Sequence, residues 1–278
     1  MHCAHCEIGV EAQDVVGGTG PPGKCGACHA ALYDSVACQR ADWPRHRAVC
    51  AALARVTRHS RAEMEEAYRV PTVEARVAKL DDGDTLRIDR PLVAGQKKSA
   101  SIRFDGVDAP EIWHPSFKLP DGSTHEGQPL GDDAALFIAT LAPLGATVRL
   151  APKPSTRADR YGRSVADLWI EQPGDSSWVW LQEALLESGY AHRYADYDKK
   201  AYLDGGAERA RVQHLDYSAE RAKSGRLGVW RALACGFDPM VPHAWRHNTP
   251  EARAFQLAQW RAAAACLDSE SPSPKKKS

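Results

Sequence analysis

Three short segments of the chain bring acidic and arginine side chains into turns. They are Asp82-Gly83-Asp84-Thr85, Arg103 to Glu111, and Asp159-Arg160-Tyr161-Gly162-Arg163. Phosphodiester hydrolysis needs a divalent cation held by carboxylates, a carboxylate that orients or deprotonates water, and arginines that stabilise transition-state charge. Together the three segments contain all of these groups. Taken alone, the first segment is more typical of a hairpin turn with solvated aspartates.

A second group of reactive side chains lies in the first fifty residues. Six of the eight cysteines fall there, four of them in two Cys-x-x-Cys pairs. Zinc takes four thiolate or imidazole ligands, and a two-residue gap lets paired cysteines reach one ion. We therefore expect metal binding there, the alternative being a reduced cysteine-rich segment without metal. Cys235 and Cys266 have no metal-ligand spacing and are expected to be ordinary thiols.

The elements that must position these groups follow from the hydrophobic pattern. Alternating apolar and polar residues around the Asp82-Gly83 turn predict a bent antiparallel pair of strands. The predicted strands are 73–80, 85–88, 101–107, 146–150 and 163–170. The predicted helices are 51–70, 132–141, 180–189, 207–226 and 250–266. Strands with interspersed helices favour a small barrel with helices packed on it.

The N-terminal segment resembles a known zinc module. Residues 33–50 are similar to the second half of a MYND zinc finger, with Gln39, Trp43, His46 and Cys50 at that family's spacing. The resemblance implies two zinc ions in a cross-braced pattern and recruitment of short proline-containing peptides. One implied site consists of Cys25, Cys28, His46 and Cys50, and the other of Cys3, Cys6, Asp34 and Cys38. The family has cysteine where Asp34 stands, so a carboxylate would be the fourth ligand unless His2 or His5 replaces it.

Residues 72–230 resemble the staphylococcal nuclease family. The resemblance rests on the three acidic and arginine segments in this order, on Gly189-Tyr190-Ala191 and on Gly228-Val229-Trp230. It implies an α+β fold: a five-stranded OB-type β-barrel with packed helices, preceded by the small zinc-binding module. The implied division is a finger (1–50), a helical linker (51–71), a nuclease-like domain (72–230), a helical C-terminal extension (231–267) and a disordered tail (268–278).

The same resemblance implies which residues carry the metal and the base. Asp84 and Asp108 would bind one Ca²⁺ together with the backbone carbonyl of Ala109, where the family usually has threonine. Thr85 would support the metal ligands. Glu111 would act as general base on the attacking water.

The resemblance also implies residues that contact the substrate. Arg103 and Arg163 would clamp the scissile phosphate, and Tyr161 would contact the terminal nucleotide. Tyr194 and Tyr197 are further stacking candidates, with hydrophobic closure of the barrel as the alternative.

These observations predict a calcium-dependent nuclease for DNA or RNA that prefers single strands and is tethered to a protein partner by the finger. The alternative is an adaptor that binds nucleic acid or peptides through the barrel. Catalysis at the finger is disfavoured because its sites look closed and leave no position for water. The insertion 112–127, with His114 and His125, is expected to shape substrate access, the alternative being a second metal site.

Composition limits the remaining possibilities. The chain has 278 residues with 36 basic and 36 acidic side chains, and no run of eighteen apolar residues, so we expect no membrane span. Residues 71–230 are slightly acidic, which predicts weak, metal-dependent attraction of nucleic acid. Without a secretory signal the expected location is cytoplasm or nucleus, and Lys275 to Lys277 are either a weak nuclear address or a solvated tail. No oligomeric state is predicted.

Overall fold

The computed structural model describes residues 23–33, 35–67, 72–92, 99–124, 127–152, 159, 161–172, 176–194 and 206–270. Its centre is a closed barrel formed by β3 (Val73–Leu80), β4 (Thr85–Ile88), β5 (Ala100–Phe104), β7 (Thr147–Pro152) and β8 (Ser164–Glu171). The strands follow the order β5-β4-β3-β7-β8, and a parallel pairing of β5 with β8 closes the ring. The predicted five-stranded barrel of an α+β fold is therefore confirmed.

The predicted strands lie close to their observed positions, with two differences. The expected strand 101–107 is divided into β5 and β6 (Val107–Asp108) by a turn at Gly106. β6 then pairs with β10 (His192–Arg193), which places Asp108 opposite His192. The other difference is β9 (Trp178–Trp180), which the sequence pattern did not indicate and which extends the sheet beyond β8.

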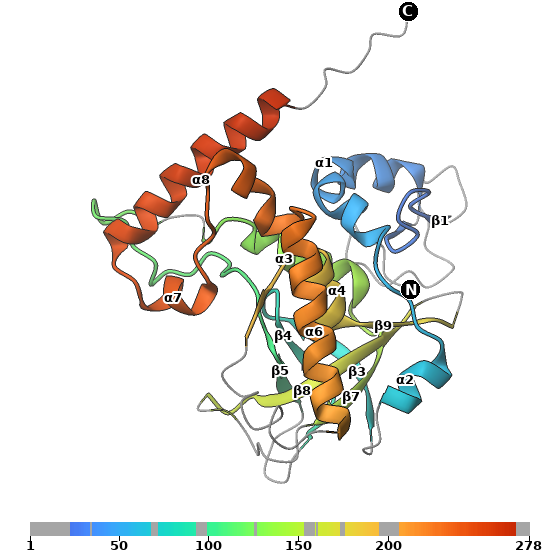
Figure 1. Cartoon of the computed structure of the whole chain (residues 1–278). Coiled ribbons are helices and arrows are strands. Elements are labelled where there is room, and N and C mark those ends of the chain that lie inside the picture. Colours follow the sequence, from blue (N-terminus) through green and yellow to red (C-terminus); the bar gives the residue numbers. More distant parts are fainter. Residues whose placement is uncertain are drawn as a thin grey trace, which may run out of the picture.

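Three helices cover the barrel: α3 (Gly131–Leu141), α4 (Leu181–Glu187) and α6 (Gly206–Ser224) (Figure 1). The burial of β8 reflects this cover, because seven of its eight residues are buried on both faces. Arg211 of α6 pairs with Asp105 at 2.7 Å and with Asp167 at 2.5 Å, so it ties the helix to the turn after β5.

The finger module consists of β1 (Gly23–Lys24), β2 (Leu32–Tyr33) and α1 (Val36–Leu53). α1 begins at Ser35, whose side chain accepts a hydrogen bond from the Cys38 amide at 3.2 Å. The module packs on the helical layer, where the Tyr190 hydroxyl donates to the carbonyl of Ala48 at 3.2 Å. Within the described residues, no helix has the length and apolar character needed to cross a membrane.

The connector after the finger is not the single helix predicted for 51–70. α1 ends at Leu53, α2 (Arg61–Ala67) begins after a non-helical stretch, and residues 68–71 lie outside the described ranges. The stretch between the helices bonds to the barrel instead. His59 exchanges two backbone hydrogen bonds of 2.8 Å with Trp178, and the Thr57 amide donates to Glu187 at 2.8 Å. These tertiary contacts outweigh the helix propensity of the segment.

The C-terminal extension forms η1 (Gly228–Cys235), α7 (Pro242–His247) and α8 (Pro250–Glu270). α8 continues past Asp268, where the tail was expected to begin, and residues 271–278 lie outside the described ranges. Figure 1 shows α7 and α8 on the side of the helical layer away from α1.

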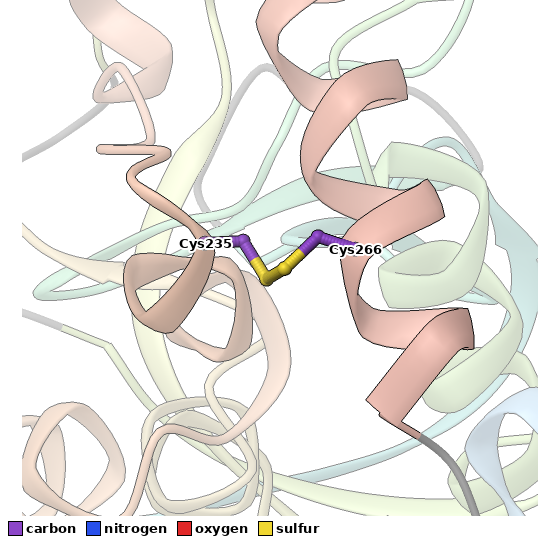
Figure 2. The surroundings of a disulfide bond; sticks show 2 residues. All are labelled: Cys235 and Cys266. Carbon is purple, nitrogen blue, oxygen red and sulfur yellow. A yellow bond between two sulfur atoms is a disulfide. The ribbon is translucent and has the colours of Figure 1, made fainter.

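The prediction of ordinary thiols at Cys235 and Cys266 is wrong, because the two form a disulfide (Figure 2). They are separated by 31 positions in sequence, but η1 and α8 bring their Cα atoms to 6.1 Å. This approach depends on how two helices pack, which local spacing does not reveal.

Candidate active site and zinc module

The pairing of β4, β5 and β8 brings the three acidic and arginine segments together at one end of the barrel. Thr85 at the start of β4 lies opposite Arg103 near the end of β5. Arg163 directly precedes β8, and its guanidinium donates to the Thr85 hydroxyl at 3.3 Å. The Phe104 amide donates to the carbonyl of Asp84 at 2.9 Å, which holds the turn before β4 against β5.

Arg103 links the two aspartates that the sequence suggested as metal ligands. Its guanidinium lies 2.6 Å from Asp84 Oδ2 and 2.7 Å from Asp108 Oδ1, and both carboxylates are buried. The amide of Ala109 donates to Asp84 Oδ2 at 2.6 Å. The residues Asp84, Asp108 and Ala109 are therefore neighbours, as a shared cation requires.

The acidic groups at this end of the barrel are crowded and poorly hydrated. Burial and the neighbouring Asp84 raise the pKa of Asp82 to about 8. Burial, more than the charge of Asp84, raises the pKa of Asp108, while Arg103 and Arg246 oppose the rise. Buried carboxylates are stabilised by a nearby positive charge, which Arg103 supplies here and which a hard divalent cation such as Ca²⁺ would also supply.

Glu111 lies beside this cluster and is held by its backbone. Gln128 donates its amide to the Glu111 carbonyl at 2.8 Å and accepts from the Glu111 amide at 3.2 Å through its side chain. Burial raises the pKa of the Glu111 carboxyl to about 7, although Arg246 lowers it. Gln128 could not be predicted from the sequence, because its role rests on contacts across the insertion.

Arg163 is oriented by Asp159, another residue without a predicted role. Asp159 accepts from the Arg163 Nε at 2.8 Å and from the amides of Tyr161 and Arg163 at 2.9 Å. The Tyr161 ring is exposed and lies beside the Arg163 guanidinium, 5.3 Å from its centroid. Tyr161 is therefore available to a ligand that also contacts Arg163.

The two further stacking candidates are Tyr194 and Tyr197. Tyr194 donates its amide to the carbonyl of Gly106 at 3.0 Å, so its backbone lies next to the turn that precedes Asp108. Tyr197 and His125 lie outside the described residues. His114 contacts Ser116 within its own loop, at 2.6 Å between Nδ1 and Oγ.

A further arginine reaches the cluster from the C-terminal extension. Arg246 of α7 donates to the Glu111 carboxylate through Nη1 and to both oxygens of Asp108 through Nη2, at 3.2 and 3.4 Å. The Asp108 carboxylate also accepts from the amide of His243 at 2.9 Å. Arg246 could not be predicted from the sequence, because no local motif connects it to a segment 135 residues earlier.

The finger brings Cys25, Cys28, His46 and Cys50 together. Their ligand atoms lie within 4.8 Å of one another, with 3.8 Å between the sulfurs of Cys25 and Cys50 and 3.4 Å between Cys28 Sγ and His46 Nε2. Two sulfurs about 2.3 Å from one tetrahedral zinc ion would lie about 3.8 Å apart. Burial and the neighbouring thiols raise the pKa of Cys50 to about 12, and a bound divalent cation would stabilise its thiolate. These residues fit zinc.

Of the other implied zinc ligands, the structure describes Cys38. Cys38 is partly buried in the first turn of α1. Cys3, Cys6 and Asp34 lie outside the described residues, so the second zinc site stays a prediction.

A closed OB-type barrel with paired carboxylates and arginines at one end, joined to a Cys₃His module, defines a nuclease-like domain with a zinc finger. Comparison with known families agrees with both parts. Residues 101–232 match the staphylococcal nuclease homologue family, and residues 3–50 match the MYND finger. The chain therefore contains a domain of each kind, and both resemblances inferred from the sequence are confirmed. Asp84 precedes the matched nuclease range, and Arg246 follows it.

Curated relatives are similar over 53% to 60% of the chain. An uncharacterized 38.1 kDa protein of Capnoides sempervirens is 32% identical over 149 residues, which is 53% of this chain and 32% of that protein. The probable staphylococcal-like nuclease CAN1 of Oryza sativa subsp. japonica is 27% identical over 151 residues, 54% of this chain and 34% of the relative. Endonuclease YhcR of Bacillus subtilis (strain 168) is 27% identical over 174 residues, 60% of this chain and 12% of the relative. The chain spans about a third of the length of the first two relatives.

Proposed function

We propose that the protein is a calcium-dependent nuclease that hydrolyses phosphodiester bonds of DNA or RNA, with a preference for single strands. One observation carries the proposal: Arg103 joins Asp84 and Asp108 at the same end of the barrel as Glu111 and Arg163. The family match and the relatives named as nucleases support it.

Asp84, Asp108 and the carbonyl of Ala109 would hold one calcium ion, which would polarise the scissile phosphate. Glu111 accepts a proton from the attacking water, and Gln128 fixes its backbone. Arg103 and Arg163 bind the phosphate oxygens and stabilise their growing charge, for which the planar guanidinium is well suited. The exposed Tyr161 ring contacts the nucleotide beside Arg163, and Tyr194 and Tyr197 supply further stacking surface.

The finger would bind a protein partner and carry two zinc ions. Its α1 exposes Val36 and Trp43, which are seven residues apart and so lie on one face of the helix. This apolar surface suits a short proline-containing peptide, and the finger would then tether the nuclease to its partner.

The substrate class is tested with DNA and RNA strands of one sequence, each offered single-stranded and as a duplex. The purified 278-residue chain is dialysed free of calcium and assayed before and after calcium is added back, with magnesium as the comparison metal. We expect cleavage only with calcium, and faster cleavage of single strands. Cleavage that is equally fast with magnesium, or restricted to duplexes, would contradict the proposal.

A further inference from the structure

The C-terminal extension contributes a side chain to the candidate active site. Arg246 contacts Glu111 and Asp108 at once, although it lies beyond the part of the chain that matches the nuclease family. Its side chain is 35% exposed, against 11% for Arg103. A guanidinium has five N–H donors, so Arg246 can reach a ligand from solvent while it still faces the carboxylates.

The fold holds α7 firmly in this position. Trp245, the neighbour of Arg246, is fully buried in a small apolar cluster with Phe117 and Leu257. Arg253 of α8 donates to the carbonyls of Trp245 at 3.1 Å and Asn248 at 2.8 Å, which satisfies the C-terminal end of α7. Contacts of Trp245 and Asn248, which lie on either side of Arg246 in sequence, therefore hold Arg246 in place.

The extension also packs against the insertion 112–127. The Arg253 guanidinium lies 5.0 Å from the centroid of the Phe117 ring. Gln128, which holds the backbone of Glu111, donates its side-chain amide to the carbonyl of Met240 at 2.5 Å. The disulfide between Cys235 and Cys266 then fastens α8 to η1 (Figure 2). Insertion and extension therefore form one wall beside Glu111.

Two histidines flank Arg246 on this wall. Arg246 projects beside His243 and His247, whose exposed rings lie 4.7 Å apart on the same helix. All three arginines contact carboxylates: Arg103 pairs with Asp84 and Asp108, Arg163 with Asp159, and Arg246 with Asp108 and Glu111. Arg246 is the most exposed of the three and lies on the Glu111 side of the cluster.

We propose that Arg246 forms a second phosphate-binding subsite, which takes the backbone phosphate next to the scissile one on a single-stranded nucleic acid. This inference rests on the proposed nuclease function and extends the substrate site onto the C-terminal extension. When the strand binds, Arg246 donates to the neighbouring phosphate while α7 stays in place. A short strand with one phosphodiester would lack this contact.

The test measures binding of a labelled single-stranded phosphorothioate oligothymidylate to the 278-residue chain with calcium, by fluorescence anisotropy over a range of salt concentrations. Phosphorothioate linkages keep their charge and resist cleavage. Arg246→Gln should weaken binding about tenfold, as expected for a charge-assisted contact. It should also reduce the slope of log affinity against log salt by about 0.7, the value for one phosphate contact on a single strand. Arg246→Lys should have the same slope as the wild type. Arg261→Gln, which removes one exposed charge from α8, should change neither quantity by as much.

The outcomes separate this inference from the proposed function. If the wild-type protein neither binds the oligomer nor cleaves DNA or RNA with calcium, the nuclease proposal fails. If the wild type binds and cleaves but Arg246→Gln matches Arg261→Gln, only the second subsite is excluded. Tighter binding by Arg246→Gln would also overturn it, because Arg246 would then be blocking the site. If Arg246→Gln does not fold, the test rests on Arg246→Lys. A smaller slope of log affinity against log salt in Arg246→Lys than in the wild type would then contradict the inference.

Discussion

The guanidinium of Arg246 donates to the carboxylate of Glu111 across 135 positions of sequence. Glu111 belongs to the barrel, and Arg246 belongs to an extension that lies outside the family match. The contact makes the extension part of the candidate active site. A shortened protein that ended with the family match at residue 232 would lose Arg246 and the apolar cluster around Trp245.

The disulfide should stabilise the extension. Replacing both Cys235 and Cys266 by serine opens a loop of 31 residues in the unfolded chain, which should lower the free energy of unfolding by about 3–4 kcal/mol. Chemical denaturation of the double variant and the wild type measures the difference. Mutation is preferable to a thiol reductant, which would also bind zinc. Equal midpoints would show that the pairing adds nothing to stability.

Glu183 of α4 should make the attachment of both the connector and α6 depend on pH. Its carboxylate bonds to His59 and to His214, each at 2.6 Å. Hydrogen bonds from the two histidines hold the pKa of Glu183 at about 2 against the effect of burial, and Glu183 raises the pKa of both histidines. The stabilisation is therefore complete between the ordinary carboxyl and imidazole pKa values. This stabilisation is lost as the pH rises through the raised pKa values of His59 and His214. It is also lost as the pH falls towards 2, the pKa of Glu183.

The comparison of His214→Gln with the wild type checks this. The melting temperature of the variant should be lower than that of the wild type at pH 6, and the gap should shrink by pH 9. A gap of constant size across this range would show that the charged form of His214 does not matter.

The finger should lose one zinc ion when His46 is replaced by alanine. His46 Nε2 lies 3.4 Å from Cys28 Sγ, so the variant leaves three thiols with an open position. Native mass spectrometry of the 278-residue chain counts the bound metal. His247→Ala, on α7, is the control and should keep the wild-type zinc content. An unchanged count in His46→Ala would place the metal elsewhere.

Gly131 should be essential for the position of Glu111. A Cβ atom at this residue would overlap the Glu111 carbonyl oxygen, which also accepts from Gln128. Gly131→Ala must therefore push the backbone of Glu111 away, and we expect kcat to fall by about tenfold or more while the barrel stays folded. Circular dichroism and steady-state kinetics measure the two effects. Wild-type kcat in a folded variant would show that Glu111 tolerates displacement.

Much of the barrel could be predicted because its strands carry local signals. The alternation around the Asp82-Gly83 turn and the acidic and arginine segments mark β3, β4 and β5 and the residues at their ends. The Cys-x-x-Cys pairs likewise mark the zinc module. The contacts of Arg246, Gln128 and the Cys235–Cys266 disulfide could not be predicted in this way, because each joins distant segments through helix packing. The connector differs from the single helix predicted for 51–70 for the same reason, because its hydrogen bonds to Trp178 and Glu187 are tertiary contacts.

The central claim is that Glu111 and the carboxylates beside it hydrolyse phosphodiesters with calcium. The most direct measurement is a calcium titration of single-stranded DNA cleavage by the wild type and by Glu111→Gln, with Glu251→Gln on α8 as control. We predict calcium-dependent cleavage by the wild type and the control, and turnover lower by about 10² or more in Glu111→Gln at saturating calcium. Equal turnover by Glu111→Gln and the wild type would contradict the account.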